Sequence, residues 1–272
     1  MAIALLSDIH GNLAALEAVL KDIKQRKDVD KMVCLGDIVG YGPYPVECLA
    51  LVRKACKPRN VLLGNHDLDA ASPGRDSMLD PVWRPNMDWT ARQLNAVQRR
   101  WLRARPQQIF INGVIAAHGK PMSDEKANGN LSRIYEYSSV FDEREEANLC
   151  QVCDYVNELR GQGKRAHYAA FGHLHLPFIY APAGPGGYWD WNDPGKKEYI
   201  LSRGKGFLLV CVPSVGLPRD GDNRTGYAVI DRKNATLVRL EYDTERTIKA
   251  LRDREVPGRD RIIKLVAFGK EH

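Results

Sequence analysis

The chain opens with MAIALLSDIHGN (residues 1–12), where a short apolar run leads directly into a polar cluster. The same transition returns twice, at residues 32–37 and at residues 61–66. Apolar residues at helical spacing fill the two intervals, over residues 13–27 and again over residues 46–52. Strand, helix, strand, helix and strand in this order predict two βαβ units and a parallel sheet.

The rest of the chain continues the mixture of helices and strands. Asn112-Gly113 between two apolar runs predicts a β-hairpin over residues 109–117. Residues 90–103 and 143–159 have helical periodicity, and the second helix is expected to end near Gly161. Further strands are expected at residues 169–171, 207–212, 226–230 and 235–240.

One segment departs from this regular pattern. Residues 181–206 are rich in Gly, Pro and Trp and predict a long loop or an irregular hairpin. Neither an internal repeat nor a linker interrupts the chain, so residues 1–272 are expected to form a single domain with residues 181–206 as an insertion.

Composition excludes several classes of protein. Of the 272 residues, 44% are apolar and 27% are charged, which is ordinary for a globular protein and excludes a disordered polyelectrolyte, a collagen and a coiled-coil rod. No apolar run reaches the roughly 20 residues that cross a bilayer, and no secretory signal is read at the N-terminus. These features predict a cytoplasmic protein without a membrane partner.

Charge and cysteine content point to no special class of partner. The net charge of +6 is a mild excess that predicts a solvated surface; binding to phosphate-bearing ligands, including nucleic acid, stays open. Cys150 and Cys153 form a single CxxC pair inside helical periodicity, without the second pair that a zinc ribbon requires. The six cysteines are therefore interpreted as reduced thiols. The sequence carries no signal for an oligomeric state.

Five polar clusters carry the chemistry, and each follows an apolar run. Ligands of open parallel sheets bind beyond the carboxyl ends of the strands. The first three clusters lie about 30 residues apart, which is the length of one βαβ unit, so their side chains are expected to meet at one edge. The residues concerned are Asp8 and His10, Asp37, Asn65 and His66, His118, and His173 and His175.

The donor types in these clusters suit a pair of metal ions. Carboxylate, imidazole and carboxamide ligands favour Mn, Fe, Zn, Co or Ni over a thiolate-binding ion. Asp37 has two carboxylate oxygens and could bridge two ions. Each residue alone also has a structural interpretation as a helix cap, a turn former or a hydrogen-bonded histidine. Five of the seven histidines nevertheless fall into these clusters in order, and only His167 and His272 keep the structural interpretation.

These clusters resemble the pattern of the calcineurin-like metallophosphoesterase superfamily. That pattern is D-x-H, then G-D, then G-N-H-D/E, then H, then G-H-x-H, and all five blocks occur here in the same order. The likeness extends over residues 3–241 to the small bacterial and archaeal phosphodiesterase-like branch. Residues 36–43 (GDIVGYGP) and residues 214–222 (SVGLPRDGD) are similar to that branch.

The resemblance implies a fold and a set of roles. The implied fold is α/β, a four-layer α-β-β-α sandwich of two facing mixed sheets flanked by helices. One metal ion would be held by Asp8, His10, Asp37 and His175. The other would be held by Asp37, Asn65, His118 and His173. His66 would protonate the leaving group or stabilise the transition state, which makes His66 and the shared Asp37 the expected catalytic residues.

The expected reaction is hydrolysis of a small phosphodiester, such as a cyclic nucleotide or a nucleotide-like compound. Two divalent ions, with manganese as one option, lower the pKa of a bridging water, and the hydroxide attacks phosphorus in line. A phosphomonoesterase or a dinucleoside polyphosphate hydrolase on the same metal core is the alternative enzyme. A non-catalytic scaffold that binds protein partners is the alternative of another class.

Two residues depart from the pattern of the superfamily's protein phosphatases and limit what carries over. Protein phosphatases of the superfamily read G-D-x-V-D-R-G, where the later Asp orients the catalytic His and the Arg grips phosphate. Here Gly40 and Tyr41 stand in those places, which argues against a phosphoprotein phosphatase and leaves the orientation of His66 open, with Asp67 and Asp69 as candidates.

The sequence does not identify the residues that contact the substrate. Arg75, Arg84, Arg92 and Arg219 are candidates for the pocket wall, although a solvated position is favoured for each. Tyr188, Trp189 and Trp191 could stack a base, although packing of the insertion is the favoured role of these rings.

Overall fold

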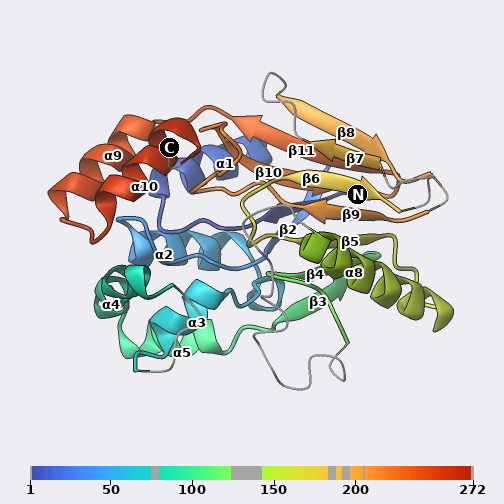
Figure 1. Ribbon diagram of the computed structural model, residues 1–272, viewed down its shortest axis with the longest axis horizontal. Helices are drawn as coiled ribbons and strands as arrows, with labels where there is room; N and C mark the ends of the chain where they lie inside the picture. Colours follow the sequence, from blue (N-terminus) through green and yellow to red (C-terminus); the bar gives the residue numbers. More distant parts are fainter. Residues whose placement is uncertain are drawn as a thin grey trace.

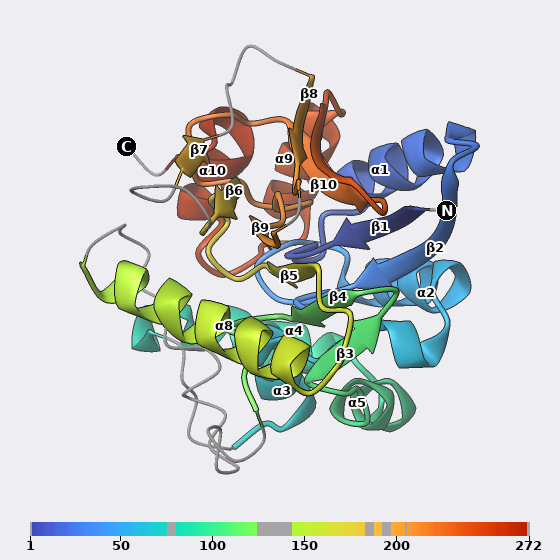
Figure 2. The same cartoon turned by 90° about the vertical axis from the view of Figure 1, so that its right-hand side faces the viewer.

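Two β-sheets lie face to face, and helices cover their outer sides (Figures 1 and 2). The computed structural model describes residues 2–74, 80–123, 143–182, 188–191, 197–204 and 206–270. The arrangement is the four-layer α/β sandwich that the family resemblance implied.

The first sheet has five strands in the order β2-β1-β10-β11-β8. β1 pairs with β2 in parallel, and every other pairing in this sheet is antiparallel. The strands are β1 (Ala2–Leu6), β2 (Val29–Cys34), β8 (Glu198–Ser202), β10 (Thr225–Ile230) and β11 (Asn234–Leu240).

The second sheet has six strands in the order β3-β4-β5-β9-β6-β7. Its centre is parallel, because β5 pairs in parallel with both β4 and β9, and its edges are antiparallel. The strands are β3 (Gln108–Ile111), β4 (Val114–Ala117), β5 (Tyr168–Phe171), β6 (Phe178–Ala181), β7 (Tyr188–Trp191) and β9 (Leu208–Cys211).

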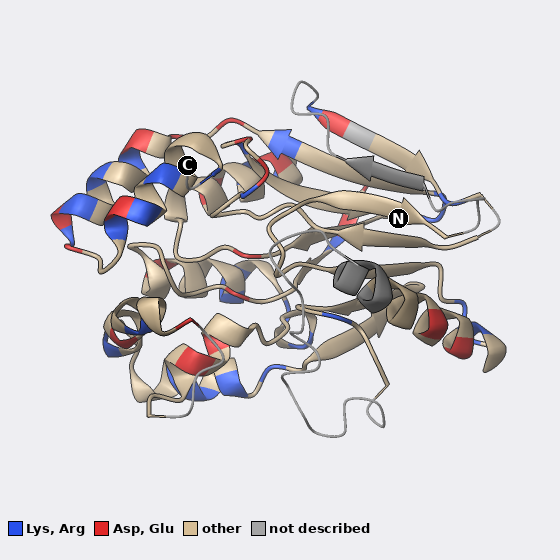
Figure 3. Ribbon diagram, viewed as in Figure 1, with Lys and Arg blue, Asp and Glu red and all other residues tan. Residues whose placement is uncertain are grey.

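The helices form the outer layers and one end of the molecule. α1 and α2 lie against the first sheet, whereas α8 lies across the second (Figure 2). The helices are α1 (Leu13–Gln25), α2 (Pro45–Ala55), η1 (Pro58–Asn60), α3 (Asn65–Ala71), η2 (Pro81–Trp83), α4 (Arg84–Gln93), α5 (Ala96–Arg103), α8 (Glu143–Gly161), α9 (Thr244–Asp253) and α10 (Arg259–Phe268). Acidic and basic residues are interleaved on α9 and α10, as expected of a solvated surface (Figure 3).

Strand β1 shows how the apolar runs build the layers. Successive side chains of a strand point to opposite faces, so Ile3 and Leu5 enter the core between the sheets. Ala2, Ala4 and Leu6 face the core under α1 and α2. Because both faces of β1 are buried, its sequence is continuously apolar rather than alternating.

The second predicted βαβ unit is incomplete, and this corrects the sequence interpretation. Residues 61–63 form only a single parallel bridge, between Val61 and Cys34. The amide of Leu62 donates to Cys34 O at 2.8 Å, but the amide of Leu63 donates to Pro106 O at 2.9 Å. The segment thus leaves the edge of β2 after one residue, although it still delivers Asn65 to the same edge.

Two further segments differ from the predicted elements. The single helix expected over residues 90–103 is two helices, because Asn95 caps α5 by accepting from the amide of Gln98 at 2.9 Å. The insertion at residues 181–206 contributes β7 and β8, one to each sheet, rather than a loop or one hairpin. The hairpin around Asn112-Gly113 and the end of α8 at Gly161 are confirmed.

The topology gathers the parallel strand ends at one edge. β1 and β2 of the first sheet and β4, β5 and β9 of the second end there, followed by the polar clusters of the sequence. This edge is therefore the place to look for a functional site.

Candidate metal centre

The structure brings all seven predicted ligand residues and His66 to this edge. Asp8 and Asp37 follow β1 and β2, whereas His118 and His173 follow β4 and β5. Asn65 and His66 are the first two residues of α3, whose start lies beside Asp37. Apart from His173, which is half-buried, these side chains are almost completely shielded from solvent.

Five of the ligand residues share a rare backbone conformation. Asp8, His10, Asp37, His173 and His175 all have positive φ, between 48° and 68°. Residues other than glycine seldom adopt this left-handed region, and such strain collects at functional sites, where the surrounding structure enforces it. The strain is a functional signal that the sequence did not reveal.

One set of donors is formed by Asp8, His10 and His175. His175 Nε2 lies 3.3 Å from Asp8 Oδ1 and 3.1 Å from His10 Nε2. All three side chains are buried, so water cannot solvate the charge of Asp8.

A second set is formed by Asp37, His118 and His173, together with Asn65. His118 Nε2 lies 3.2 Å from Asp37 Oδ2 and 3.1 Å from Asn65 Oδ1. His173 Nδ1 also lies 3.1 Å from Asn65 Oδ1.

Asp37 stands between the two sets. Its Oδ1 accepts a hydrogen bond from the amide of His66 at 2.9 Å. Its Oδ2 faces His118 of the second set and, at 3.7 Å, His10 Nε2 of the first. A single carboxylate oxygen therefore meets imidazoles of both sets, as a bridging ligand would.

The hydrogen bonds behind the imidazoles show that the first set fits a cation. His10 Nδ1 donates to Val39 O at 3.3 Å, and His175 Nδ1 donates to Leu217 O. A carbonyl can only accept, so each neutral ring presents a bare lone pair at Nε2. These two lone pairs face each other at 3.1 Å, a repulsive arrangement that a shared cation would relieve.

The electrostatics of the cluster favour charged carboxylates and mostly neutral imidazoles. Burial opposes ionisation of Asp37, but the charges of His118 and His66 outweigh it and hold its pKa well below the usual range. Burial lowers the pKa of His173 to about 3. Burial also disfavours the charged form of His118, yet the neighbouring Asp37 raises its pKa to about 9. Ionised carboxylates and neutral imidazoles are the forms that bind divalent metals.

His66 is held by ring packing and lies close to the carboxylate of Asp37. Its Nδ1 is buried and has no hydrogen-bond partner in the described parts of the chain. The ring lies 4.5 Å from the ring of Tyr41 and 4.8 Å from that of His10. A Cβ added to Gly40 would come within 2.7 Å of His66 Nδ1, so only glycine leaves room for the imidazole.

Asp67 has a different role from the one proposed for it. Its Oδ1 accepts from the amides of Ile38 and Val39 at 2.9 and 3.1 Å, and its Oδ2 accepts from the amide of Gly64 at 3.3 Å. The carboxylate thereby joins the loop that carries Asp37 to the turn that begins α3.

The loop after β9 supports the site from the other side. Ser214 Oγ donates to Asp8 O at 3.0 Å, and the amide of Gly216 donates to the same carbonyl at 2.9 Å. A Cβ on Gly216 would lie 2.0 Å from Ile9 O, so the approach of the two loops requires glycine.

The arginines and aromatic residues that were candidates for the pocket wall differ in their exposure and in their distance from the site. Arg84 and Arg92 are exposed on α4, whereas Arg219 is half-buried and lies next to His175. Arg75 and the side chains of residues 188–191 lie outside the described parts of the structure.

Comparison with known proteins gives this arrangement a family. The sequence profile of the calcineurin-like phosphoesterases matches residues 1–204. The chain belongs to the calcineurin-like phosphoesterase family. This phosphoesterase is therefore a hydrolase that acts on phosphoric esters, and the family's divalent metals have a set of donors here that fits them.

Two relatives resemble this phosphoesterase over nearly their whole length, and a third resembles it over a quarter of its length. The uncharacterised protein MJ0912 of Methanocaldococcus jannaschii is 32% identical over 265 residues, which is 94% of this chain and 93% of that protein. The crystal structure of a metallophosphoesterase from Sphaerobacter thermophilus is 30% identical, with a TM-score of 0.74 over 99% of this chain and 100% of that one. The symmetrical bis(5′-nucleosyl)-tetraphosphatase of Psychromonas ingrahamii is 37% identical over 68 residues, 25% of each protein.

Among the described residues, no helix is both long enough and apolar enough to span a bilayer.

Proposed function

We propose that this phosphoesterase hydrolyses phosphodiesters of nucleotide-like compounds at a centre that binds two divalent ions. The observation that carries this proposal is the pair of donor sets that share Asp37, one with Asp8, His10 and His175 and the other with Asn65, His118 and His173. Bound divalent ions would supply a water of lowered pKa and neutralise charge on the phosphoryl oxygens.

The side chains around the centre divide the remaining work. Asp8 and Asp37 provide negative charge, and the carbonyls of Val39 and Leu217 fix the ring orientations of His10 and His175. His66 packs against His10, and we assign it the hydrogen bond or proton that stabilises the departing oxygen. General acid catalysis of this kind contributes typically 10²–10⁴-fold.

The surroundings of His66 favour a diester over a phosphoprotein. The place where protein phosphatases of the superfamily have a phosphate-gripping Arg is taken by Tyr41, which is buried against His66 and Trp83. A diester carries less negative charge than a monoester dianion and therefore needs fewer cationic side chains.

Hydrolysis of dinucleoside polyphosphates is the second candidate. The likeness to a symmetrical bis(5′-nucleosyl)-tetraphosphatase over 68 residues favours it. The likeness covers 25% of each protein, so it supports the shared chemistry more than the shared substrate.

A substrate panel tests the proposal. Protein loaded with Mn²⁺ is given bis-aryl phosphodiesters, aryl phosphomonoesters, 2′,3′- and 3′,5′-cyclic nucleotides, and dinucleoside polyphosphates. The highest kcat/KM is expected on a diester, whereas a clear preference for monoesters would contradict the proposal and a preference for dinucleoside polyphosphates would select the second candidate.

Metal analysis tests the shared ligand separately. Two ions per chain are expected for the wild type by elemental analysis, and Asp37→Asn is expected to lower that number. A variant that still binds two ions with wild-type affinity would contradict bridging by Asp37.

A further inference from the structure

We propose that Arg219 is the residue that binds the phosphoryl oxygens of the substrate. This inference rests on the proposed phosphoester chemistry and adds to it the cationic contact that Tyr41 cannot provide. It also replaces the solvated position that the sequence favoured for this arginine.

The backbone places Arg219 beside a ligand residue. Its amide donates to His175 O at 3.2 Å, while Leu217 O accepts from His175 Nδ1. The loop of residues 217–219 thus contacts His175 at both its backbone and its ring. Any shift of Arg219 would disturb the ring that faces Asp8.

The charge of Arg219 reaches the expected proton donor. The guanidinium charge of Arg219 acts on the ring of His66. Arg219 and His66 therefore lie in the same part of the site, although they come from different ends of the sequence.

No carboxylate in the described structure neutralises Arg219. Its Nε is buried and has no hydrogen-bond partner among the described residues. The two acids that follow it are occupied by other arginines, since Asp220 pairs with Arg239 and Asp222 pairs with Arg224 at 2.6 Å. A buried N–H without an acceptor is rare in proteins and calls for an explanation such as a ligand.

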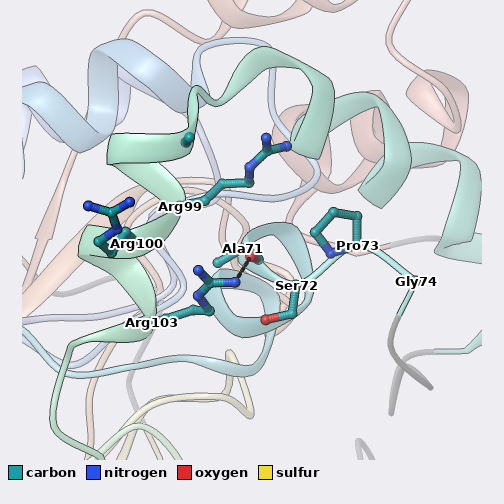
Figure 4. A pocket seen from close by; sticks show the side chains of 8 residues that line it. Ala71, Ser72, Pro73, Gly74, Arg99, Arg100 and Arg103 are labelled. Atoms are coloured by element: carbon teal, nitrogen blue, oxygen red, sulfur yellow. Dashed lines mark hydrogen bonds between the residues drawn. The ribbon is translucent and has the colours of Figure 1, made fainter.

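Two other arginines, which border a pocket of their own, have structural partners. Arg103 and Arg99 border the pocket at the end of α3 (Figure 4), where Arg103 Nη1 donates to Ala71 O and Arg99 Nη1 donates to Ala91 O, each at 3.2 Å. These two guanidinium groups satisfy carbonyls at helix ends. In the described parts of the chain Arg219 has no such partner, which distinguishes it from them.

The chemistry of the Arg219 guanidinium indicates its ligand. A guanidinium offers several N–H donors in one plane, a geometry that matches two oxygens of a phosphate. Beside two sets of metal-type donors, the anion that fits is the phosphoryl group being transferred. Arg219 then takes part in binding and orientation, whereas His66 takes part in the departure of the alcohol.

The test measures phosphate binding and turnover separately. Arg219→Ala and Arg219→Lys are loaded with Mn²⁺, and inorganic phosphate is titrated by calorimetry alongside kcat and KM on a bis-aryl phosphodiester. We expect Arg219→Ala to weaken phosphate binding and to lower kcat/KM by about tenfold or more each. Arg219→Lys should restore part of both, and bound metal should stay at the wild-type level in both variants.

The control is Arg232→Ala, which removes the same charge in the turn after β10. Ile230 pairs with Ile3 near the start of β1, so this turn lies at the end of the first sheet opposite to the centre. Phosphate affinity within twofold of wild type in both Arg219 variants would overturn the inference. The result is independent of turnover: a wild type that binds phosphate through Arg219 but hydrolyses no diester would contradict the proposed function alone.

Discussion

At the scale of single residues, several residues of the site adopt an unfavourable backbone conformation. Asp8, Asp37 and His173 hold positive φ at the first turn beyond a strand, and each costs of order 1–3 kcal/mol. That cost is offset by buried contacts such as the bonds of Ser214 and Gly216 to the Asp8 carbonyl. The strain fixes the direction of each donor before any ligand arrives.

His66 is the residue whose replacement separates catalysis from metal binding. His66→Asn is expected to keep the metal content and to lower turnover of an aryl phosphodiester by at least about tenfold, because the departing oxygen loses its hydrogen-bond donor. Elemental analysis and steady-state kinetics check this. His167→Asn, a change outside the cluster, serves as the control, and wild-type turnover in His66→Asn would refute the assigned role.

At the scale of elements, loops rather than strands hold the centre together. The Asp67 carboxylate binds amides at residues 38, 39 and 64 and so ties the loop after β2 to the start of α3. The loop after β9 binds the turn after β1 in the same way. Short strands can therefore carry the site, because hydrogen bonds between their terminal loops set its dimensions.

Removal of the Asp67 carboxylate tests this connection. Asp67→Ala leaves three buried amide donors without an acceptor, which is expected to destabilise the protein by roughly 1–3 kcal/mol or more and to weaken metal binding. Urea denaturation and metal titration measure the two effects. Asp80→Ala, which removes an exposed carboxylate that accepts from Val82 N, should change stability by less than about 1 kcal/mol. Equal effects of the two changes would contradict the role of Asp67.

At the scale of the whole molecule, the centre joins the two sheets. Asp8 and Asp37 come from the first sheet, whereas His118, His173 and His175 come from the second. Metal bound to both sets would connect the two sheets in addition to their shared apolar core and the hydrogen bonds between their terminal loops. Loss of metal should therefore be felt throughout the fold, as well as in activity.

The stability of metal-free protein should pass through a maximum near pH 6.5. Burial depresses the pKa values of His10, His66 and His173, outweighing the opposite shift at Asp67, so stability rises as pH increases from about 4 towards 6.5. The pKa of His118 is raised to about 9 by Asp37, so its contribution is fully present below about 6.5 and is lost as pH rises through 9.

Thermal denaturation after chelation measures this profile. The alkaline decline is expected to reach at most roughly 3 kcal/mol, from the shift of His118 between its ordinary value and about 9. Metal-loaded protein is the control, because a coordinated His118 holds no proton there and the decline should disappear. A metal-free protein as stable at pH 9 as at pH 6.5 would contradict this account.

Much of the fold could be predicted because its signals are local. The runs at residues 3–6 and 32–35 identified β1 and β2, and the polar residues after each strand located the edge where ligands collect. The strand expected at residues 61–63 was wrong because the amide of Leu63 donates to Pro106 O instead of to β2. Pro106 is distant in the chain, so the local sequence gives no sign of this contact.

By itself, the sequence determined the order of strands and helices at the N-terminal end and the eight side chains that gather at the centre, because periodicity and donor type are properties of neighbouring residues. Only the tertiary structure decided that Tyr41 packs against His66, that Asp67 binds backbone amides, and that Arg219 has no acidic partner among the described residues. These outcomes depend on competition among groups far apart in the chain, which folding alone brings within hydrogen-bonding distance.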